Sequence, residues 1–300
     1  MKPAYYQEYY HLEREHWWFK ARENILFTHL KLLLPPGQRS KILNIGAATG
    51  RTSEWLMELG EVKSIEYDPD CYEFTRLHVG IDIIQASALD LPYDTDSFDL
   101  VCAFDVLEHI EDHALAIQEI KRVYKPTGLV SITVPAFQFL WNQHDDVNHH
   151  MRRYRLPQLV DLFKDGDDQG EVRYKSYFNF WLFFPIAVFR MFSKLRPSRH
   201  SRRTDAGSNF YVMNGGFYQR FFYWVFNAEN WFIKRKIYLP IGLSVLLTWR
   251  KKADFAPSRV STVELNEQQR SKSVKTVPEF QGFRPRTRQK SLIPIFLIPN

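Results

Sequence analysis

Residues 42–51 read ILNIGAATGR, and this stretch decides the fold. A short apolar strand ends at Gly46, a tight turn follows, and a helix is predicted to begin after Gly50. Glycine lets the backbone of such a turn come close to a ligand, and the free N–H groups of the helix start attract its polar groups. The stretch therefore predicts a nucleotide-binding turn, although a plain strand-to-helix connection would have the same appearance.

A second strand ends in an acidic residue where a nucleotide site needs one. The predicted strand 62–67 contains Glu66, which lies 20 residues after Gly46. At that separation, doubly wound folds place the carboxylate that accepts hydrogen bonds from both ribose hydroxyls. The turn reads G-x-x-x-G without the third glycine of a dinucleotide fingerprint, and this disfavours a nicotinamide cofactor.

Strands and helices alternate through the first half of the chain. The predicted strands are 41–45, 62–67, 81–85, 98–104 and 129–134, and the predicted helices between them are 51–59, 69–78 and 113–124. Alternation at this spacing implies right-handed crossovers and a parallel sheet that is covered on both faces. Beyond Pro135 the pattern predicts helices over 156–163, 178–195 and 216–236, and strands over 171–176 and 240–249.

Five motifs follow one another between residues 43 and 128. They read LNIGAATG (43–50), SALDLPY (87–93), DSFDLV (96–101), AFDVLEHI (103–110) and KPTG (125–128). In this order they resemble the class I S-adenosylmethionine-dependent methyltransferases. The resemblance implies an α/β fold with a Rossmann-like, doubly wound, mostly parallel seven-stranded sheet, here with an aromatic helical insertion before the last strand. The segment HWWF (16–19) adds a resemblance to a bacterial subgroup that carries a hydrophobic C-terminal extension.

The resemblance also assigns the cofactor-binding residues. They are Asn44, Gly46, Ala48, Gly50, Glu66, Ser87, Ala88, Leu89, Asp105 and Val106. Three of them depart from the family pattern, because Asn44 and Ser87 replace acids and Ala48 replaces a glycine. We expect these changes to weaken binding of S-adenosylmethionine without abolishing it, and a non-catalytic relative stays as an alternative.

The chemistry of methyl transfer needs few protein groups, because the sulfonium of the cofactor is already activated. A hydroxyl acceptor must lose a proton, and a histidine is suited to remove it. His109, just past the fourth strand, is the candidate catalytic residue. The alternative is a histidine at a helix start that only forms a wall of the pocket.

A polar cluster follows the fifth strand, at the edge of the sheet where ligands bind. Residues 144–154 read HDDVNHHMRRY. The arginines offer forked donors for phosphate or carboxylate. We expect acceptor binding by His144, Asp145, His149, Arg152, Arg153 and Tyr154, with Trp18 in a lid above the site; a solvated loop and an ordinary packed helix are the alternatives. No metal is expected, because neither ligand-spaced histidines on a helix nor cysteines support one.

The charge and the aromatic residues are unevenly spread. Residues 1–189 carry 19 basic against 28 acidic side chains, whereas residues 190–300 carry 21 against 6. Of the aromatic residues, 19 of 47 lie between Tyr177 and Phe232, with basic residues such as Arg190 around them. Aromatic and aliphatic faces with basic rims fit an anionic membrane surface. For this insertion, 177–238, we rank a membrane surface first, a homodimer second and nucleic acid third.

These observations predict three parts: an N-terminal lid helix (1–37), a methyltransferase domain (38–252) and a disordered basic tail (253–300). Two cysteines cannot form a disulfide framework, and the first residues lack a signal-peptide pattern, so we expect a cytoplasmic protein, peripheral at the inner face of the plasma membrane. The expected activity is O-methylation of a small, lipid-linked or glycan acceptor. A quinone-type C-methyltransferase and a non-catalytic membrane scaffold are the alternatives.

Overall fold

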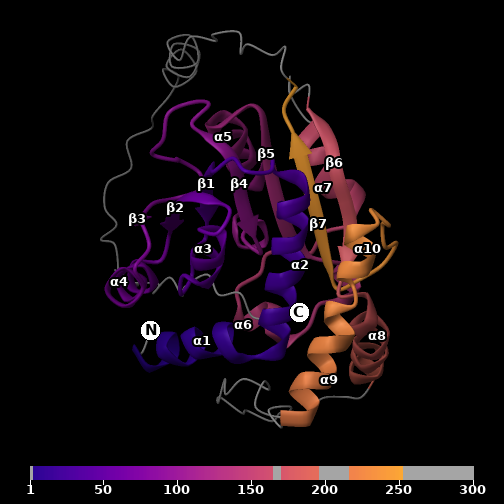
Figure 1. Cartoon of the computed structure of the whole chain (residues 1–300). Coiled ribbons are helices and arrows are strands. Elements are labelled where there is room, and N and C mark those ends of the chain that lie inside the picture. The colour runs from indigo at the N-terminus through magenta and orange to yellow at the C-terminus, as the bar shows by residue number, and fades with distance from the viewer. Residues whose placement is uncertain (1–2, 165–169, 196–215, 253–300) are drawn as a thin grey trace, which may run out of the picture.

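The fold is built on one seven-stranded sheet. The computed structural model describes residues 3–164, 170–195 and 216–252. The strand order is β3-β2-β1-β4-β5-β7-β6, with β7 antiparallel to both of its neighbours and the other pairs parallel (Figure 1). The strands are β1 (Ser40–Ile45), β2 (Gly60–Glu66), β3 (Ile83–Gln85), β4 (Phe98–Phe104), β5 (Tyr124–Pro135), β6 (Glu171–Phe178) and β7 (Ser244–Arg250).

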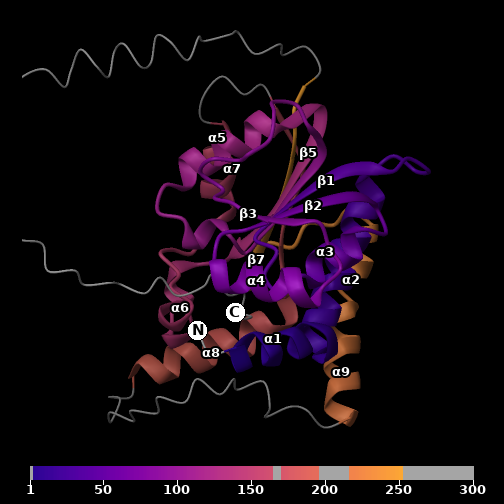
Figure 2. The same ribbon diagram turned by 90° about the vertical axis from the view of Figure 1, so that its left-hand side faces the viewer.

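Helices cover both faces of the sheet, as Figure 2 shows in edge view. Alternate residues of β4 face opposite ways: Leu100, Cys102 and Phe104 pack with α2 (Trp17–Leu33) and α3 (Arg51–Leu56), whereas Val101 and Ala103 pack with α5 (His113–Val123) and α7 (Leu156–Lys164). The strands are therefore apolar on both sides, as in parallel sheets generally. Helix α4 (Pro69–His78) packs at β2 and β3.

A further group of helices lies at the carboxyl edge of the parallel strands (Figures 1 and 2). Helix α1 (Pro3–Glu15) reaches the turn after β1, where Arg14 pairs with Glu54 at 2.7 Å. Helix α8 (Phe180–Leu195) starts directly after β6, and α9 (Gly216–Asn227) packs against α2. Helix α10 (Asn230–Lys234) then leads into β7, and α6 (Gln143–Val147) follows β5. No helix within residues 3–164, 170–195 and 216–252 combines the length and the apolar character that a membrane crossing requires.

The predicted fold class is confirmed, and most predicted elements are present. The predictions for 69–78 and 98–104 match α4 and β4 at both ends. The single helix predicted over 216–236 is two helices, α9 and α10, because the chain turns at Ala228–Glu229. Helix α6 was not predicted, and α1 is a separate helix within the N-terminal segment for which a single helix was expected.

Two expectations about the surroundings of the sheet need correction. Residues 1–37, expected to form one lid helix, contain α1 and α2, and α2 buries Ile25, Leu26 and Leu30 against the sheet as an integral layer. Arg190, expected among the basic residues at the surface, is buried and donates a hydrogen bond to the carbonyl of Leu140. The predicted tail 253–300 lies outside the described residues.

Candidate active site

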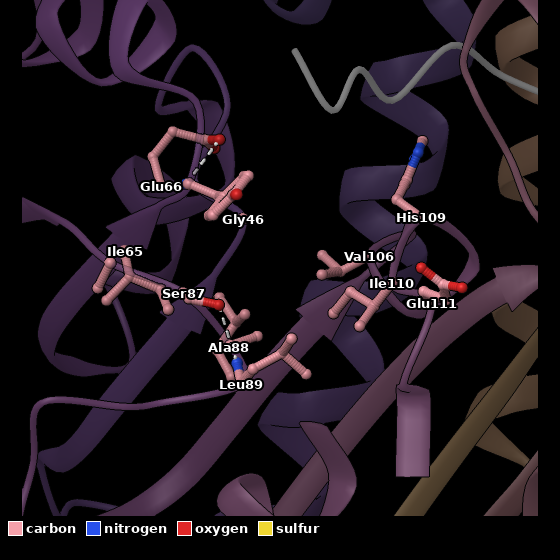
Figure 3. A pocket seen from close by; sticks show the side chains of 13 residues that line it. Gly46, Ile65, Glu66, Ser87, Ala88, Leu89, Val106, His109, Ile110 and Glu111 are labelled. Atoms are coloured by element: carbon pink, nitrogen blue, oxygen red, sulfur yellow. Dashed lines mark hydrogen bonds between the residues drawn. The ribbon is translucent and has the colours of Figure 1, made fainter. Parts of the chain in front are cut away.

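A cavity of about 230 Å³ opens at the carboxyl ends of β1, β2 and β4. Strands β1 and β4 are neighbours, but the chain continues from β1 to β2 on one side and from β4 to β5 on the other side. Doubly wound sheets bind their ligands at such a switch point, where the strand order reverses. Figure 3 shows Gly46, Glu66 and Ser87 on one side of the cavity and Val106, His109 and Ile110 on the other. The sequence-predicted residues Gly46, Glu66, Ser87, Ala88, Leu89, Val106 and His109 all line it.

The turn after β1 needs glycine at its first position. Gly46 has φ +74°, and its N–H donates to the carbonyl of Ile65 at 3.0 Å. A Cβ at Gly46 would lie 2.6 Å from Cγ2 of Val106, inside van der Waals contact. The absence of a side chain therefore keeps β1 and the end of β4 close together at the floor of the cavity.

Glu66 holds the two loops on its side of the cavity. Its carboxylate accepts hydrogen bonds from the backbone N–H groups of Ala48 (2.9 Å), Tyr67 (2.9 Å) and Asp68 (3.0 Å). The side chain is almost completely buried, and burial raises its pKa to about 7 even though these hydrogen bonds favour the ionised form. A carboxylate fixed in this way, at the end of β2, is placed to accept hydrogen bonds from a diol.

The loop after β3 supplies the apolar wall. Ala88 and Leu89 line the cavity opposite Ile110, and the Leu89 N–H donates to the Ser87 hydroxyl at 3.1 Å (Figure 3). Small and aliphatic side chains on both sides leave room for a flat ring between them. Ser87, where the family often has an acid, uses its hydroxyl to shape this loop.

Three predicted cofactor residues act from outside the cavity. Asn44 donates to the Ser53 hydroxyl at 2.9 Å, between β1 and α3. Gly50, with φ +88°, is the N-cap of α3, and a Cβ there would touch Val79 at 3.0 Å. Ala48 adopts φ 48° and presents its N–H to Glu66. All three residues shape the turn after β1, and none of them lines the cavity.

Asp105 is tied to Arg22, a residue that no sequence motif marks. Arg22 of α2 donates to Asp105 Oδ2 at 2.5 Å and to the Thr133 hydroxyl at 3.0 Å. Both side chains are largely buried, and Asp105 has φ 57°. Arg22 lies four residues after Trp18, so both side chains are on the same face of α2. This helical spacing could have placed Arg22 at the carboxyl edge of the sheet together with Trp18, and the sequence analysis did not use it.

Two buried groups next to the cavity lack well-formed hydrogen bonds in the described part of the chain. They are the carboxyl group of Glu108, at both oxygens, and the ring of His109, at both nitrogens, although the backbone of Asn148 and of His149 lies close enough to the His109 ring to oppose the fall of its pKa. Burial and the neighbouring Asp105 raise the pKa of Glu108 well above its usual range. Burial, together with His150, lowers the pKa of His109 to about 3, so this imidazole is neutral at pH 7.

The cluster at 144–154 folds into a loop held by a buried ion pair. Arg153 donates from Nε and Nη2 to the two oxygens of Asp145, at 2.8 and 3.0 Å, and from Nη1 to the carbonyl of Ala136. Asp145 also accepts from His150 Nδ1 at 2.8 Å. The guanidinium group of Arg153 was expected to bind an acceptor, but its donors are used in hydrogen bonds within the protein.

The other predicted acceptor residues are spread around this loop. The Tyr154 hydroxyl contacts the Leu107 carbonyl and His113. Arg152 donates to the Glu111 carbonyl at 3.0 Å, and His149 is exposed. His144 lies in α6, and its side chain is outside the described part. Trp18 is buried in a cluster with Ala48, next to the glycine turn.

Comparison with known proteins agrees with this geometry. Residues 43–132 match the model of a methyltransferase domain family. A Mycobacterium tuberculosis protein named as a probable S-adenosylmethionine-dependent methyltransferase is 25% identical over 159 residues, which cover 52% of this chain and 57% of that protein. A demethylmenaquinone methyltransferase of Staphylococcus carnosus is 27% identical over 146 residues, covering 43% and 58%. The chain thus spans less than two thirds of the length of these curated relatives.

A solved structure shows the same fold. A chain from the complex of the Haloferax volcanii Trm112 methyltransferase activator with a methyltransferase superposes with a TM-score of 0.52 at 15% identity, covering 85% of this chain and 96% of that one. The glycine turn and the carboxylate at the end of β2 lie where the sequence resemblance implied them. Residues 43–132 therefore form a domain of the class I S-adenosylmethionine-dependent methyltransferase family.

Proposed function

We propose that the protein transfers the methyl group of S-adenosylmethionine to an oxygen atom of a small, lipid-linked or glycan acceptor at a membrane surface. The observation that carries the enzymatic part is the cavity at the switch point, which joins the Gly46 turn to the buried Glu66 carboxylate. The surface of α8 and α9 supports the location.

The residues around the cavity fit the proposed cofactor. Glu66 faces the cavity with a carboxylate that can accept hydrogen bonds from the ribose hydroxyls. Ala88, Leu89 and Ile110 would enclose the adenine, and the close approach of Gly46 and Val106 leaves a backbone floor for the ribose and the sulfonium. When bound, the cofactor supplies an activated methyl group.

His109 lines the cavity on the side opposite Glu66 and Gly46, and on this side the acceptor would approach the methyl group in our proposal. Its neutral ring has a lone pair that can accept a hydrogen bond from an acceptor hydroxyl and so orient its oxygen. Positioning of this kind supplies most of the acceleration in an in-line transfer. A pKa near 3 makes His109 a weak general base when it acts alone. Its role as the proton acceptor stays a prediction.

The helices at the carboxyl edge expose two apolar stripes. On α8, Trp181, Phe184, Val188 and Met191 are exposed at helical spacing, and on α9 the exposed residues are Phe217, Phe221 and Trp224. The basic side chains at the end of α10 and directly after it are exposed as well: Lys234, Arg235 and Lys236. Exposed rings with basic side chains nearby are suited to the interface of an anionic bilayer. The protein would then take its acceptor from the membrane, with the stripes of α8 and α9 lying along the surface and its body in the cytoplasm.

One specific observation favours a second acceptor class. Demethylmenaquinone methyltransferases are among the relatives, and the substrate in their name, demethylmenaquinone, is a quinone. C-methylation of a quinone is therefore the alternative activity, and it would use the same cofactor cavity and the same apolar surface. A non-catalytic scaffold is the third possibility.

Calorimetric titration with S-adenosylmethionine tests the enzymatic proposal. The full chain should bind one cofactor, and Glu66→Gln should weaken binding by at least ~10-fold, because an amide places N–H groups where the ribose hydroxyls need an acceptor. Glu61→Gln, at an exposed position on the same strand, is the matched control. Absence of binding at millimolar cofactor would reject both enzyme proposals and leave the scaffold.

Flotation with anionic liposomes tests the location. Replacing Phe217, Phe221 and Trp224 by serine should abolish flotation, because all three are exposed and contribute to the stripe. Serine at Leu32 and Leu77, which are exposed on α2 and α4, is the matched control and should float like the wild type. Equal flotation of both variants contradicts the membrane proposal, and dimerisation through the stripes would appear as a loss of dimer in sedimentation.

The acceptor can be found with labelled cofactor. Incubation with cell extract, followed by separation into lipid, glycan and protein fractions, identifies the class that gains the label. Label that hydriodic acid releases as methyl iodide marks an O-methyl group. Label that stays on carbon after this treatment and is carried by a quinone would favour the C-methyltransferase over the O-methyltransferase.

A further inference from the structure

We propose that Glu108, His109 and His150 bind a divalent transition-metal ion beside the cofactor cavity. One ligand atom from each of these residues lies within 4.8 Å of the other two. No metal was expected from the sequence, because His150 is far along the chain from the other two and the three match no ligand spacing. The fold brings them together.

The geometry of the three side chains favours an ion between them. Zinc-type ions bind histidine nitrogen and carboxylate oxygen at about 2.0–2.2 Å, so their ligand atoms lie roughly 3.4 Å apart. The rings of His109 and His150 are 4.7 Å apart, centre to centre, and nearly perpendicular, so their nitrogens can converge on one point. Small rotations of the side chains would bring all three to bonding distance.

The burial of Glu108 is otherwise unexplained. Its side chain is fully buried, and neither oxygen has a hydrogen-bond partner among the residues described. An unpaired buried carboxyl group costs about 1–3 kcal/mol of stability, or more if it is ionised. Proteins keep such groups when they pair with a cation or coordinate a metal. The guanidinium groups of Arg22 and Arg153 lie near enough to oppose the rise in the pKa of Glu108, but neither donates to it: their ion pairs are with Asp105 and Asp145, and Nε of Arg22 has no partner among the residues described.

The surroundings of His150 are those of a metal ligand. Asp145 accepts the hydrogen bond from its Nδ1, which leaves Nε2 as the nitrogen that can bind an ion. A carboxylate behind a ligating histidine fixes the tautomer and the ring orientation in most metal sites. Asp145 is itself fixed by both arms of Arg153. The loop is also tied to the site by the Met151 N–H, which donates to the Glu108 carbonyl at 2.8 Å.

The donor set indicates which ion would bind. Two imidazoles and one carboxylate suit zinc, manganese, iron or cobalt, whereas magnesium and calcium prefer oxygen ligands. Three protein ligands leave at least one position open, which is typical of catalytic sites and not of structural ones. Since His109 also lines the cofactor cavity, the open position would lie near the bound cofactor.

An ion there would explain how a hydroxyl acceptor is activated; this step rests on the proposed function. A hydroxyl bound to the ion loses its proton to water, because the positive charge lowers its pKa. Its oxygen then forms a bond to the methyl carbon, while the carbon–sulfur bond of the cofactor breaks and its electron pair stays on sulfur. His109 would then give its lone pair to the ion instead of accepting a hydrogen bond from the acceptor, and the ion would orient the acceptor oxygen in its place.

Titration with Co²⁺ tests the site without any methyl acceptor. The full chain, freed of metal with a chelator, should bind one Co²⁺ with visible absorption bands typical of mixed nitrogen and oxygen ligands, and Zn²⁺ should displace it. Glu108→Gln and His150→Ala should weaken Co²⁺ binding by at least ~10- to 100-fold, the loss that even an outer-shell partner causes. His149→Ala, at the exposed neighbouring histidine, should bind Co²⁺ like the wild type.

Binding of S-adenosylmethionine by each variant separates misfolding from loss of the site. Glu108→Gln that still binds the cofactor but not Co²⁺ supports the proposal. Wild-type protein that binds the cofactor but no Co²⁺, or Co²⁺ binding that Glu108→Gln and His150→Ala leave unchanged, overturns it and leaves the methyltransferase proposal intact. If the wild type binds Co²⁺ but no cofactor, the metal site stands and the proposed function fails.

Discussion

Replacing Gly46 by alanine tests how tightly the cavity floor is built. The new residue would have to keep φ near +74°, which costs roughly 1–2 kcal/mol for a residue with a Cβ. Its Cβ would also lie 2.6 Å from Cγ2 of Val106, and relief of such overpacking costs about 1–3 kcal/mol. Together, Gly46→Ala should lower the free energy of unfolding by about 2–5 kcal/mol.

Two further variants separate these contributions. Gly37 has φ +78°, but a Cβ added there would meet nothing within 4 Å, so Gly37→Ala should show only the conformational cost of about 1–2 kcal/mol. Val106→Ala removes the methyl group that the Gly46→Ala side chain meets. The double variant should therefore be more stable than the sum of the two single changes predicts, by about 1–3 kcal/mol.

Urea unfolding measures the stability terms, and calorimetry with S-adenosylmethionine measures the effect on the cavity. Gly46→Ala should weaken cofactor binding, whereas Gly37→Ala should leave it unchanged, because Gly37 is remote from the cavity lining. Two results would refute the reasoning: equal stability losses for the two glycine variants, or additive behaviour of Gly46→Ala and Val106→Ala.

Three other predictions concern the supports of the site. Asp145→Ala should cost about 3–5 kcal/mol in urea unfolding, because it leaves the buried Arg153 without its counter-charge; a loss below ~1 kcal/mol would contradict this. Burial raises the pKa of Glu13 to about 7, so the folded state is destabilised as the pH rises towards 7 and the side chain has to ionise. The stability of Glu13→Gln relative to the wild type should therefore increase between about pH 5 and pH 8, by up to ~3 kcal/mol. A difference in stability that does not depend on pH would contradict this prediction. Trp17→Ala should cost about 3–5 kcal/mol and make α9 sensitive to protease, because the indole stacks on Phe222 of α9 at 5.2 Å; unchanged proteolysis would disprove that role.

Local sequence patterns predicted the sheet well because each strand has clear boundaries in the sequence. The strand Phe98–Phe104 is an apolar run between a polar loop and the Asp105 turn, and nothing else in its neighbourhood competes for that run. The helix Pro69–His78 has Asp68 as its N-cap and a proline at its first position. Both residues are strong local signals of a helix start. The patterns and the family resemblance together gave seven strands in a mostly parallel sheet, whereas the order of the strands was not predicted.

Local sequence patterns failed to predict contacts in which a side chain meets a partner far along the chain. Arg190 has the sequence neighbours of a surface charge, whereas the carbonyl of Leu140, fifty positions away, holds it inside. The pairing of Arg22 with Asp105 and the approach of His150 to His109 have the same origin. Single-sequence reasoning assigns types of residue to an edge of the sheet, but only packing decides which of them meet.

The position of the insertion has a consequence for engineering. Strands β6 and β7 are hydrogen-bonded neighbours, with Phe178 opposite Ser244, so the chain leaves the sheet and returns to it at the same place. A short connection could close this gap without changing the register of any strand. We expect that residues 179–243 can be transplanted into another methyltransferase of this strand order, provided that the recipient also receives the residues they pack on, such as Trp17 for α9 and Leu140 for Arg190. This change would transfer the apolar surface while the recipient keeps its own cofactor site.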